Sequence, residues 1–275
     1  MRKTPVQQTR VGNIRIADLR LDLAVQRPLY EPKVRQIVAE YDPAALRTLA
    51  VSARRNGTFV VLDGQHRLAA LKQLGMANGH LVACEIYEGL TLQEEAELFL
   101  KLNDGRKPSY REAFDVRLTA RDPDALAVKD IIEECGFTVG HKNGAKDGSI
   151  AAIAKCEAVY KGFSNNSDRR YPIILKQALF TLKGAWGATS HAVQAPLIEG
   201  TGRFYLRYGI ENVQVDHLIN NLSKYPGGPN RLIEWAKQHA ATIGTQQGRA
   251  VAEALVLQHN KGLRSISRKL SEWRS

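Results

Sequence analysis

The sequence predicts an α+β fold, in which a small mixed sheet with its helices is followed by a mainly helical region. Three short runs of strand-forming residues come early in the chain, at residues 48–53, 59–62 and 80–87. The first two are joined through Asn56-Gly57, and Asn-Gly between two strand-like runs is a strong hairpin signal. Beyond about residue 120 the strand signals nearly vanish and helical spacing dominates. We therefore expect two domains, residues 1–120 and residues 121–275.

Periodicity and helix-start signals place the other elements. Residues 11–16 alternate as a strand does. Four helices are predicted in the first domain, beginning near Glu31, Gln65, Thr91 and Ser109. The last two starts are capping boxes, in which a hydroxyl residue is followed three positions later by a glutamate. In the second domain helical spacing covers residues 123–135, 150–160, 172–186, 213–222, 231–239 and 248–260.

The charge of the chain indicates the kind of partner. Its 275 residues include 39 Lys and Arg against 28 Asp and Glu, a formal net charge of +11. Such a balance favours polyanions, nucleic acid first, through steering and counterion release. The basic run Asn260–Leu270 is either a DNA contact or a docked terminal helix with solvated lysines. Arg54 and Arg55, at the predicted hairpin tip, are either solvated or next to a polyanion.

Composition also bears on the compartment. No apolar run approaches the roughly 18 residues that a membrane span needs, and no apolar stretch follows the charges of the amino terminus. The three cysteines, Cys84, Cys135 and Cys156, lack the Cys-x-x-Cys spacing of a zinc knuckle, and their odd number argues against a disulfide framework. We therefore expect a cytoplasmic protein with no membrane partner and no structural metal site.

The stretch Asp63-Gly64-Gln65-His66-Arg67 lies between the second hairpin strand and the helix that follows it. A chain that turns from a strand into a helix on a glycine leaves the first helical N–H groups unpaired, which makes an anion site. Arg67 adds donors that suit a phosphate or carboxylate, and His66 can act as donor, acid, base or metal ligand. From the residues alone, a plain tight turn with Asp63 as a cap and Arg67 paired to a surface carboxylate is the alternative.

Together with the following Leu-Ala-Ala-Leu and Gly75, this stretch resembles the signature of the ParB/sulfiredoxin superfamily, particularly its DGQHR branch of phage, plasmid and DNA-modification-linked proteins. The resemblance covers about residues 11–115 and implies a ParB/sulfiredoxin-like fold for the first domain. In ParB-type partition proteins the equivalent Gly-x-x-Arg turn holds nucleotide phosphates. The resemblance therefore implies that role for Gly64 and Arg67.

Two further motifs have counterparts in this chain. Gln26-Arg27-Pro28 resembles the "pRxP" stretch of the superfamily, and Asn103-Asp104-Gly105-Arg106 resembles the box that follows it. The set of ligand-binding residues that the resemblance implies is Arg27, Gly64, Gln65, His66, Arg67, Asn103 and Arg106. At two positions the chain departs from the superfamily motifs, and these departures narrow the range of activities expected. Gln65 replaces the cysteine that sulfiredoxin needs, which rejects a sulfinic-acid reductase, and Leu102 replaces a glutamate of ParB, which weakens the case for CTP hydrolysis.

The function expected from these residues is a ParB-like DNA-binding protein with a nucleotide or phosphate pocket at the Asp63–Arg67 turn. The expected cofactor is a nucleoside triphosphate, CTP or ATP, with Mg²⁺, and the expected partners are DNA, the nucleotide and a second copy in a homodimer. The alternatives are an NTPase or small-molecule kinase, a metal-dependent nuclease, and a DNA-modification-linked enzyme acting on a nucleotide. For these the candidate catalytic residues are Asp63, His66 and Glu31.

Overall fold

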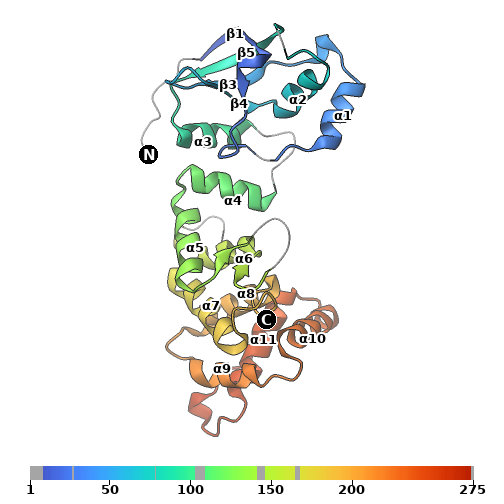
Figure 1. Ribbon diagram of the computed structural model, residues 1–275. Coiled ribbons are helices and arrows are strands. Elements are labelled where there is room, and N and C mark those ends of the chain that lie inside the picture. The colour runs from blue at the N-terminus through green and yellow to red at the C-terminus, as the bar shows by residue number, and fades with distance from the viewer. Residues whose placement is uncertain are drawn as a thin grey trace. The chain divides into compact units, whose positions relative to one another are not determined.

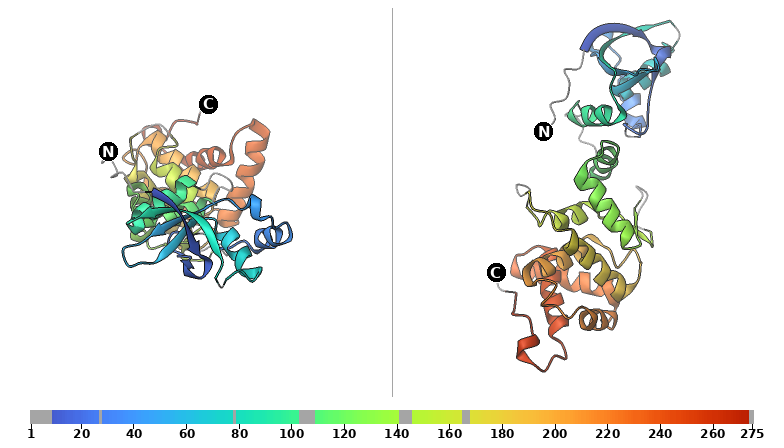
Figure 2. Two further views of the ribbon diagram at one scale, coloured as in Figure 1. Left: turned by 90° about the horizontal axis from the view of Figure 1, so that it is seen from above. Right: turned by 90° about the vertical axis from the view of Figure 1, so that its left-hand side faces the viewer.

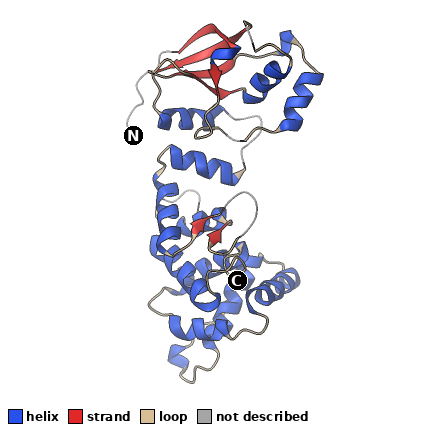
Figure 3. Cartoon of the chain, viewed as in Figure 1, coloured by secondary structure: helices blue, strands red, loops and turns tan. Residues whose placement is uncertain are grey.

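The computed structural model describes residues 9–26, 28–77, 79–102, 109–140, 146–164 and 168–273. The chain divides into two compact units, an N-terminal unit Met1–Asp122 and a C-terminal unit Pro123–Ser275. Among the described residues, all strands except one short pair lie in the N-terminal unit (Figure 3). The predicted fold class, α+β with a small mixed sheet followed by a mainly helical part, is confirmed.

A five-stranded mixed sheet forms the centre of the N-terminal unit. Its strands are β1 (Thr9–Arg15), β2 (Leu19–Arg20), β3 (Leu49–Ala53), β4 (Phe59–Asp63) and β5 (Leu81–Glu88), in the order β1-β5-β3-β4-β2. The outer pair β1–β5 and the hairpin β3–β4 are antiparallel, whereas β3–β5 and β2–β4 are parallel. The hairpin predicted from Asn56-Gly57 is therefore confirmed. The strands twist strongly around one another in the two further views (Figure 2).

Helices cover both faces of this sheet, so the central strands are buried on both sides. Along β4, Val61 packs into a core with Leu68 of α2 (Gln65–Gln73), which lies beside α1 (Glu31–Ala39) (Figure 1). Its neighbours Val60 and Leu62 face the opposite way, into a core with Phe99 of α3 (Leu92–Leu102) and residues of α4 (Tyr110–Thr119). Both capping boxes that predicted α3 and α4 are present.

The hairpin tip has an ion pair that the sequence did not indicate. Arg54 donates from Nε to Glu95 Oε1 at 2.8 Å and from Nη2 to Asp22 Oδ2 at 2.6 Å. The Glu95 side chain is fully buried, and its hydrogen bond raises the pKa of Arg54 above the ordinary value. Arg54 therefore ties the hairpin to α3 with a side chain that is 26% exposed, whereas the neighbouring Arg55 is exposed.

Helices make up most of the C-terminal unit. They are α5 (Pro123–Glu134), α6 (Ile153–Tyr160), α7 (Pro172–Trp186), α8 (Ala195–Tyr208), α9 (Val215–Ser223), α10 (Gly228–Ile243) and α11 (Gln247–Asn260), and β6 (Thr138–Val139) pairs in parallel with β7 (Ser149–Ile150). The sequence analysis missed α8, because its glycines suggest a loop. These glycines serve close packing: a Cβ at Gly200 would overlap Val251 of α11, and one at Gly202 would overlap Val159 of α6.

The carboxy-terminal run does not form the terminal helix that was one of its two interpretations. The last α-helix of the described residues, α11, ends at Asn260, and only a 3₁₀ turn, Ile266–Arg268, follows. The Asn260 side chain holds the tail by donating to the Leu270 carbonyl and accepting from the Leu270 N–H, both at 2.8 Å. No helix in the described part of the chain has the length and apolar character to cross a membrane.

Candidate functional site

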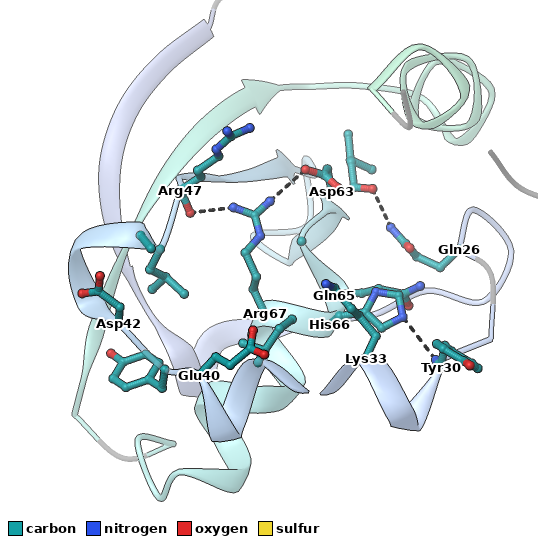
Figure 4. Close-up of a pocket in the computed structure, with 16 residues that line it drawn as sticks. Gln26, Tyr30, Lys33, Glu40, Asp42, Arg47, Asp63, Gln65, His66 and Arg67 are labelled. Atoms are coloured by element: carbon teal, nitrogen blue, oxygen red, sulfur yellow. Dashed lines mark hydrogen bonds and ion pairs between the residues drawn. The ribbon is translucent and has the colours of Figure 1, made fainter. Parts of the chain in front are cut away.

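A pocket of about 880 Å³ lies in the N-terminal unit, where α1 and the segment after it face the end of β4 and the start of α2 (Figure 4). Its lining residues are Gln26, Tyr30, Lys33, Ile37, Glu40, Tyr41, Asp42, Ala45, Leu46, Arg47, Leu62, Asp63, Gly64, Gln65, His66 and Arg67. All five residues of the predicted Asp-Gly-Gln-His-Arg turn thus line one pocket.

The bend into α2 requires glycine. Gly64 is the N-cap of α2 and has φ 99° and ψ 19°, the left-handed conformation that other residues rarely adopt. A Cβ there would also overlap Leu49 Cδ2 and come within 3.0 Å of Arg67 Nη2. As the N-cap residue, Gly64 has no side chain with which to accept from the first N–H groups of α2. Because the first turn of a helix has no intrahelical acceptors for its N–H groups, a helix start of this kind suits an anion.

Gln65, the first residue of α2, has a buried donor with no partner. Its side chain lines the pocket, only 5% of the residue is exposed, and Nε2 makes no hydrogen bond. A buried amide left unpaired costs about 1–3 kcal/mol, so such groups are rare in folded proteins. The neighbouring amide of Gln26 is satisfied, because its Nε2 donates to the carbonyls of Val61 and Leu62 at 2.7 and 2.8 Å. The contrast marks Gln65 as a donor held ready for an acceptor.

Arg67 is anchored by the chain itself. Its Nη1 donates to the carbonyls of Arg47 at 2.7 Å and Thr48 at 3.0 Å, and its Nη2 donates to Asp63 Oδ2 at 2.8 Å (Figure 4). These carbonyls precede β3 at the end of the sheet where β4 has already turned into α2. The guanidinium thus joins the backbone before β3 to the Asp63 carboxylate, and it lines the pocket.

The three predicted catalytic residues, Asp63, His66 and Glu31, differ in how they meet the pocket. His66 lines the pocket, but its Nε2 accepts a hydrogen bond of 3.2 Å from the Tyr30 N–H, so that lone pair links α2 to the start of α1. Glu31 is exposed and does not belong to the residues that line the pocket. Asp63 lines it and pairs with Arg67.

Three predicted ligand contacts, Arg27, Asn103 and Arg106, lie outside the residues that the structure describes. The sequence analysis missed the acidic and basic residues that α1 and the segment after it contribute. Lys33, Ile37 and Glu40 recur at helical spacing, so one stripe of α1 could have been assigned to a wall. Arg47 lies in a segment with no periodic pattern, and only the folded chain brings it to the turn.

The charges of the pocket wall are balanced. The basic residues are Lys33, Arg47 and Arg67, and the acidic ones are Glu40, Asp42 and Asp63. On α1, Lys33 donates to Gln36 at 3.2 Å, and Gln36 in turn donates to both carboxylate oxygens of Glu40. Among the described residues, no group of three or more His, Cys, Asp and Glu side chains is arranged to hold a metal ion.

Comparison with known proteins gives a family and two remote likenesses. No curated protein matches the chain. The structure is similar to the crystal structure of the C-terminally truncated chromosome-partitioning protein ParB from Caulobacter crescentus complexed with CTP-gamma-S, with a TM-score of 0.29 and 12% identity over 90% of this chain and 98% of that one. It is also similar to the pNOB8-like ParB N-domain, with a TM-score of 0.38 and 16% identity over 91% and 96% of the two chains.

Both likenesses are remote, so the DGQHR branch and the ligand contacts implied by the motifs stay predictions. The sequence match is more direct. The profile of a family described as "Family of unknown function (DUF6551)" matches residues 22–230, which include the pocket and most of the C-terminal unit. The chain belongs to the DUF6551 family.

Proposed function

We propose that the chain binds a phosphate-bearing ligand, a nucleotide, in the pocket at the start of α2. The observation that carries this proposal is the buried, unpaired Nε2 of Gln65 on the pocket wall, next to the glycine N-cap of α2. A phosphate oxygen in this position would accept from the helix N–H groups and from Gln65 Nε2 together. One anionic group would thereby satisfy donors from both backbone and side chain.

The size of the pocket supports a ligand larger than a free ion. Sites for small molecules and cofactors usually enclose about 300–1,000 Å³, and this pocket encloses about 880 Å³. In Figure 4, Gln26 and Gln65 lie on one side of Arg67, and Glu40 and Asp42 lie on the other side. A phosphate near Gln65 would leave the carboxylates of the other side to accept from hydroxyl or amino groups of the same ligand.

The charge balance bears on the number of phosphates. With three acidic side chains against three basic ones, the wall offers no excess positive charge for a triphosphate. CTP or ATP would therefore enter with Mg²⁺ bridging its phosphates, the common arrangement of nucleoside triphosphates in proteins. Comparing the binding of nucleoside mono-, di- and triphosphates, each with and without Mg²⁺, therefore tests this charge argument.

The contacts favour binding over catalysis. The Nε2 lone pair of His66 is taken by the Tyr30 N–H, and Glu31 lies off the pocket wall. The Asp63 carboxylate is already paired with the Arg67 guanidinium. We therefore place a nucleotide-binding protein ahead of an NTPase, a kinase or a nuclease.

A thermal-shift titration tests the pocket. Nucleotides are expected to raise the melting temperature of the wild type, because a ligand that binds only the folded state stabilises it. In Gln65→Glu a carboxylate replaces the donor, so the shift should vanish. Gln73→Glu is the matched control, because Gln73 is exposed on the same helix and does not line the pocket, and it should shift as the wild type does. Equal shifts in Gln65→Glu and the wild type would contradict the proposal, as would no shift at millimolar nucleotide.

We further propose that DNA binds through basic surface outside the pocket. The net charge of +11 supports a polyanion partner, and Lys261, Arg264, Arg268 and Lys269 are exposed on the tail after α11. Fluorescence anisotropy with duplex DNA at rising salt should show a linear decline of log affinity with log salt. Replacing Arg264, Arg268 and Lys269 by Gln should flatten that slope by about two to three units. An unchanged slope would place the DNA contact elsewhere.

A further inference from the structure

We propose that Asp63 is the internal counter-ion of the pocket: its carboxylate occupies the place on Arg67 that the anionic group of a ligand takes. Asp63 would thereby select the anions that bind, favouring phosphate over singly charged carboxylates. This inference deepens the proposed function and assigns Asp63 a role in specificity, where the sequence suggested catalysis.

One side of the Arg67 guanidinium is fixed without any ligand. Two backbone carbonyls, those of Arg47 and Thr48, accept from Nη1, and the side chain is 20% exposed. The guanidinium also lies directly against Gly64, where a Cβ would be 3.2 Å from Cζ. Because backbone atoms hold the group, its orientation does not depend on Asp63. A ligand would meet a preorganised donor at Nη2.

The other side of the Arg67 guanidinium is bound by the Asp63 side chain, which can move away. The Asp63 side chain is 41% exposed, twice as much as that of Arg67, and it accepts the 2.8 Å hydrogen bond from Arg67 Nη2. Its backbone stays paired with Ala50 as the last residue of β4, so the side chain can rotate into water without breaking the sheet. Exchange of this carboxylate for a ligand anion needs no backbone movement.

The exchange makes the pocket selective. A ligand carboxylate that replaces Asp63 gains no charge, because one singly charged acceptor is exchanged for another. A phosphate carries close to two negative charges near neutral pH and has more acceptor oxygens, so it gains electrostatic attraction to Arg67 in the exchange. Its remaining oxygens can reach the start of α2 and Gln65, which a carboxylate does less well. Asp63 would therefore weaken the binding of all anions to the pocket, and the binding of carboxylates most.

The experiment compares Asp63→Asn with the wild type by isothermal titration of the full chain with inorganic phosphate and with acetate. Asparagine keeps an oxygen that accepts from Arg67 but removes the charge. We expect about three- to tenfold tighter phosphate binding in Asp63→Asn, on the scale of one partly exposed ion pair, and a larger relative gain for acetate.

Asp18→Asn is the matched control. Asp18 forms an ion pair of the same length, 2.8 Å, with Arg15, and its side chain is 40% exposed, but it does not line the pocket. Its replacement removes the same charge from the same unit, so phosphate affinity should stay within about twofold of the wild type. Asp63→Ser is a second neutral variant should Asp63→Asn unfold, and the melting temperatures of all variants verify folding.

Each outcome decides the inference. Tighter phosphate binding in Asp63→Asn but not in Asp18→Asn supports it, even if no nucleotide binds the wild type and the proposed nucleotide function fails. Equal or weaker phosphate binding in Asp63→Asn and Asp63→Ser overturns it, even if the wild type binds nucleotides and the proposed function stands. A gain of the same size in Asp18→Asn also overturns it, since net charge alone would then explain the effect.

Discussion

Glycines are used in opposite ways in the two units. At the start of α2, Gly64 turns the chain from β4 into a helix, and the bend places the helix start and the unpaired Gln65 donor beside a pocket. In α8, Gly200 and Gly202 let neighbouring helices come so close that a methyl group would not fit. Gly64 places polar groups on the wall of a pocket, whereas Gly200 and Gly202 allow helices to pack closely.

Buried polar groups lie near the glycines in both units, and among them the hydroxyl of Thr201 in α8 and the side-chain donor of Gln65 both lack hydrogen-bond partners. Glu199 in α8 is buried and pairs with Lys155 at 2.6 Å and with Arg203 at 2.9 Å, and these partners hold its pKa below the ordinary value although burial alone raises it. Gln65 at the pocket has no partner for its donor. Position distinguishes the two unpaired groups: Gln65 lines the pocket and Thr201 does not, so an occupant of the pocket could satisfy the Gln65 donor.

Replacing Gly64 by Ala should have the largest effect. The variant forces a side chain into a left-handed conformation and against Leu49, so the free energy of unfolding should fall by about 3–5 kcal/mol. Denaturant titration measures this. Gly57→Ala is the control, because Gly57 has φ 81° but open space around it, and should lose only about 1–2 kcal/mol. Equal losses would show that steric overlap at the pocket turn is unimportant.

Gly202→Ala tests the packing of α8. The added methyl overlaps Val159, which should destabilise the chain by about 1–2 kcal/mol after the gain in helix propensity. Val159→Ala makes room for that methyl, so the double variant should recover part of the loss compared with the sum of the single variants. Strict additivity in denaturant titration would contradict direct contact between α8 and α6 at this position.

The stability of the protein should depend on pH through the titration of His259. This side chain is buried at the end of α11, where Nε2 accepts from the Gln214 N–H at 3.0 Å and Nδ1 lies 3.2 Å from Asn260 Oδ1. Burial, with a smaller contribution from His217, lowers the pKa of His259 below its ordinary value of 6.5. Below pH 6.5 the unfolded chain binds a proton that the folded chain does not, so stability is full above this pH and falls as the pH drops.

Denaturant titration between pH 7 and pH 5 measures that fall. His259→Gln keeps a hydrogen-bonding side chain that does not titrate, so its stability should decline less steeply over this range. Parallel pH profiles of the wild type and His259→Gln would refute the assignment to this residue.

Gln65→Met is expected to show the smallest change in stability, with the opposite sign. Replacing an unpaired buried amide by an apolar group of similar length should raise the free energy of unfolding by up to about 1 kcal/mol. The same variant should weaken phosphate binding, because a donor is lost. A loss of stability in the ligand-free protein would mean that the Gln65 amide already has a structural partner.

Local signals in the sequence predicted most elements of the N-terminal unit. The Asn-Gly hairpin and the capping boxes at Thr91 and Ser109 depend on residues within a few positions of one another, and all three are present. The Asp63–Arg67 turn was found in the same way, since a strand, a glycine and a helix follow directly in the chain. The α8 helix was missed because its two central glycines oppose helix formation locally and are explained only by their contacts with other helices.

By itself the sequence determined the class of fold and the place of the turn, because strand alternation, helix caps and a glycine bend are short-range properties of the chain. Only the tertiary structure decided what the side chains of the turn contact. It pairs Arg67 with Asp63 and the carbonyls before β3, and it leaves the Gln65 donor buried without a partner. The Arg67–Asp63 pair joins residues only four positions apart, and a pairing of Arg67 with a carboxylate was one of the sequence-based alternatives. The contacts of Arg67 with the carbonyls before β3 join segments about twenty residues apart, and no local pattern indicates which atoms meet there.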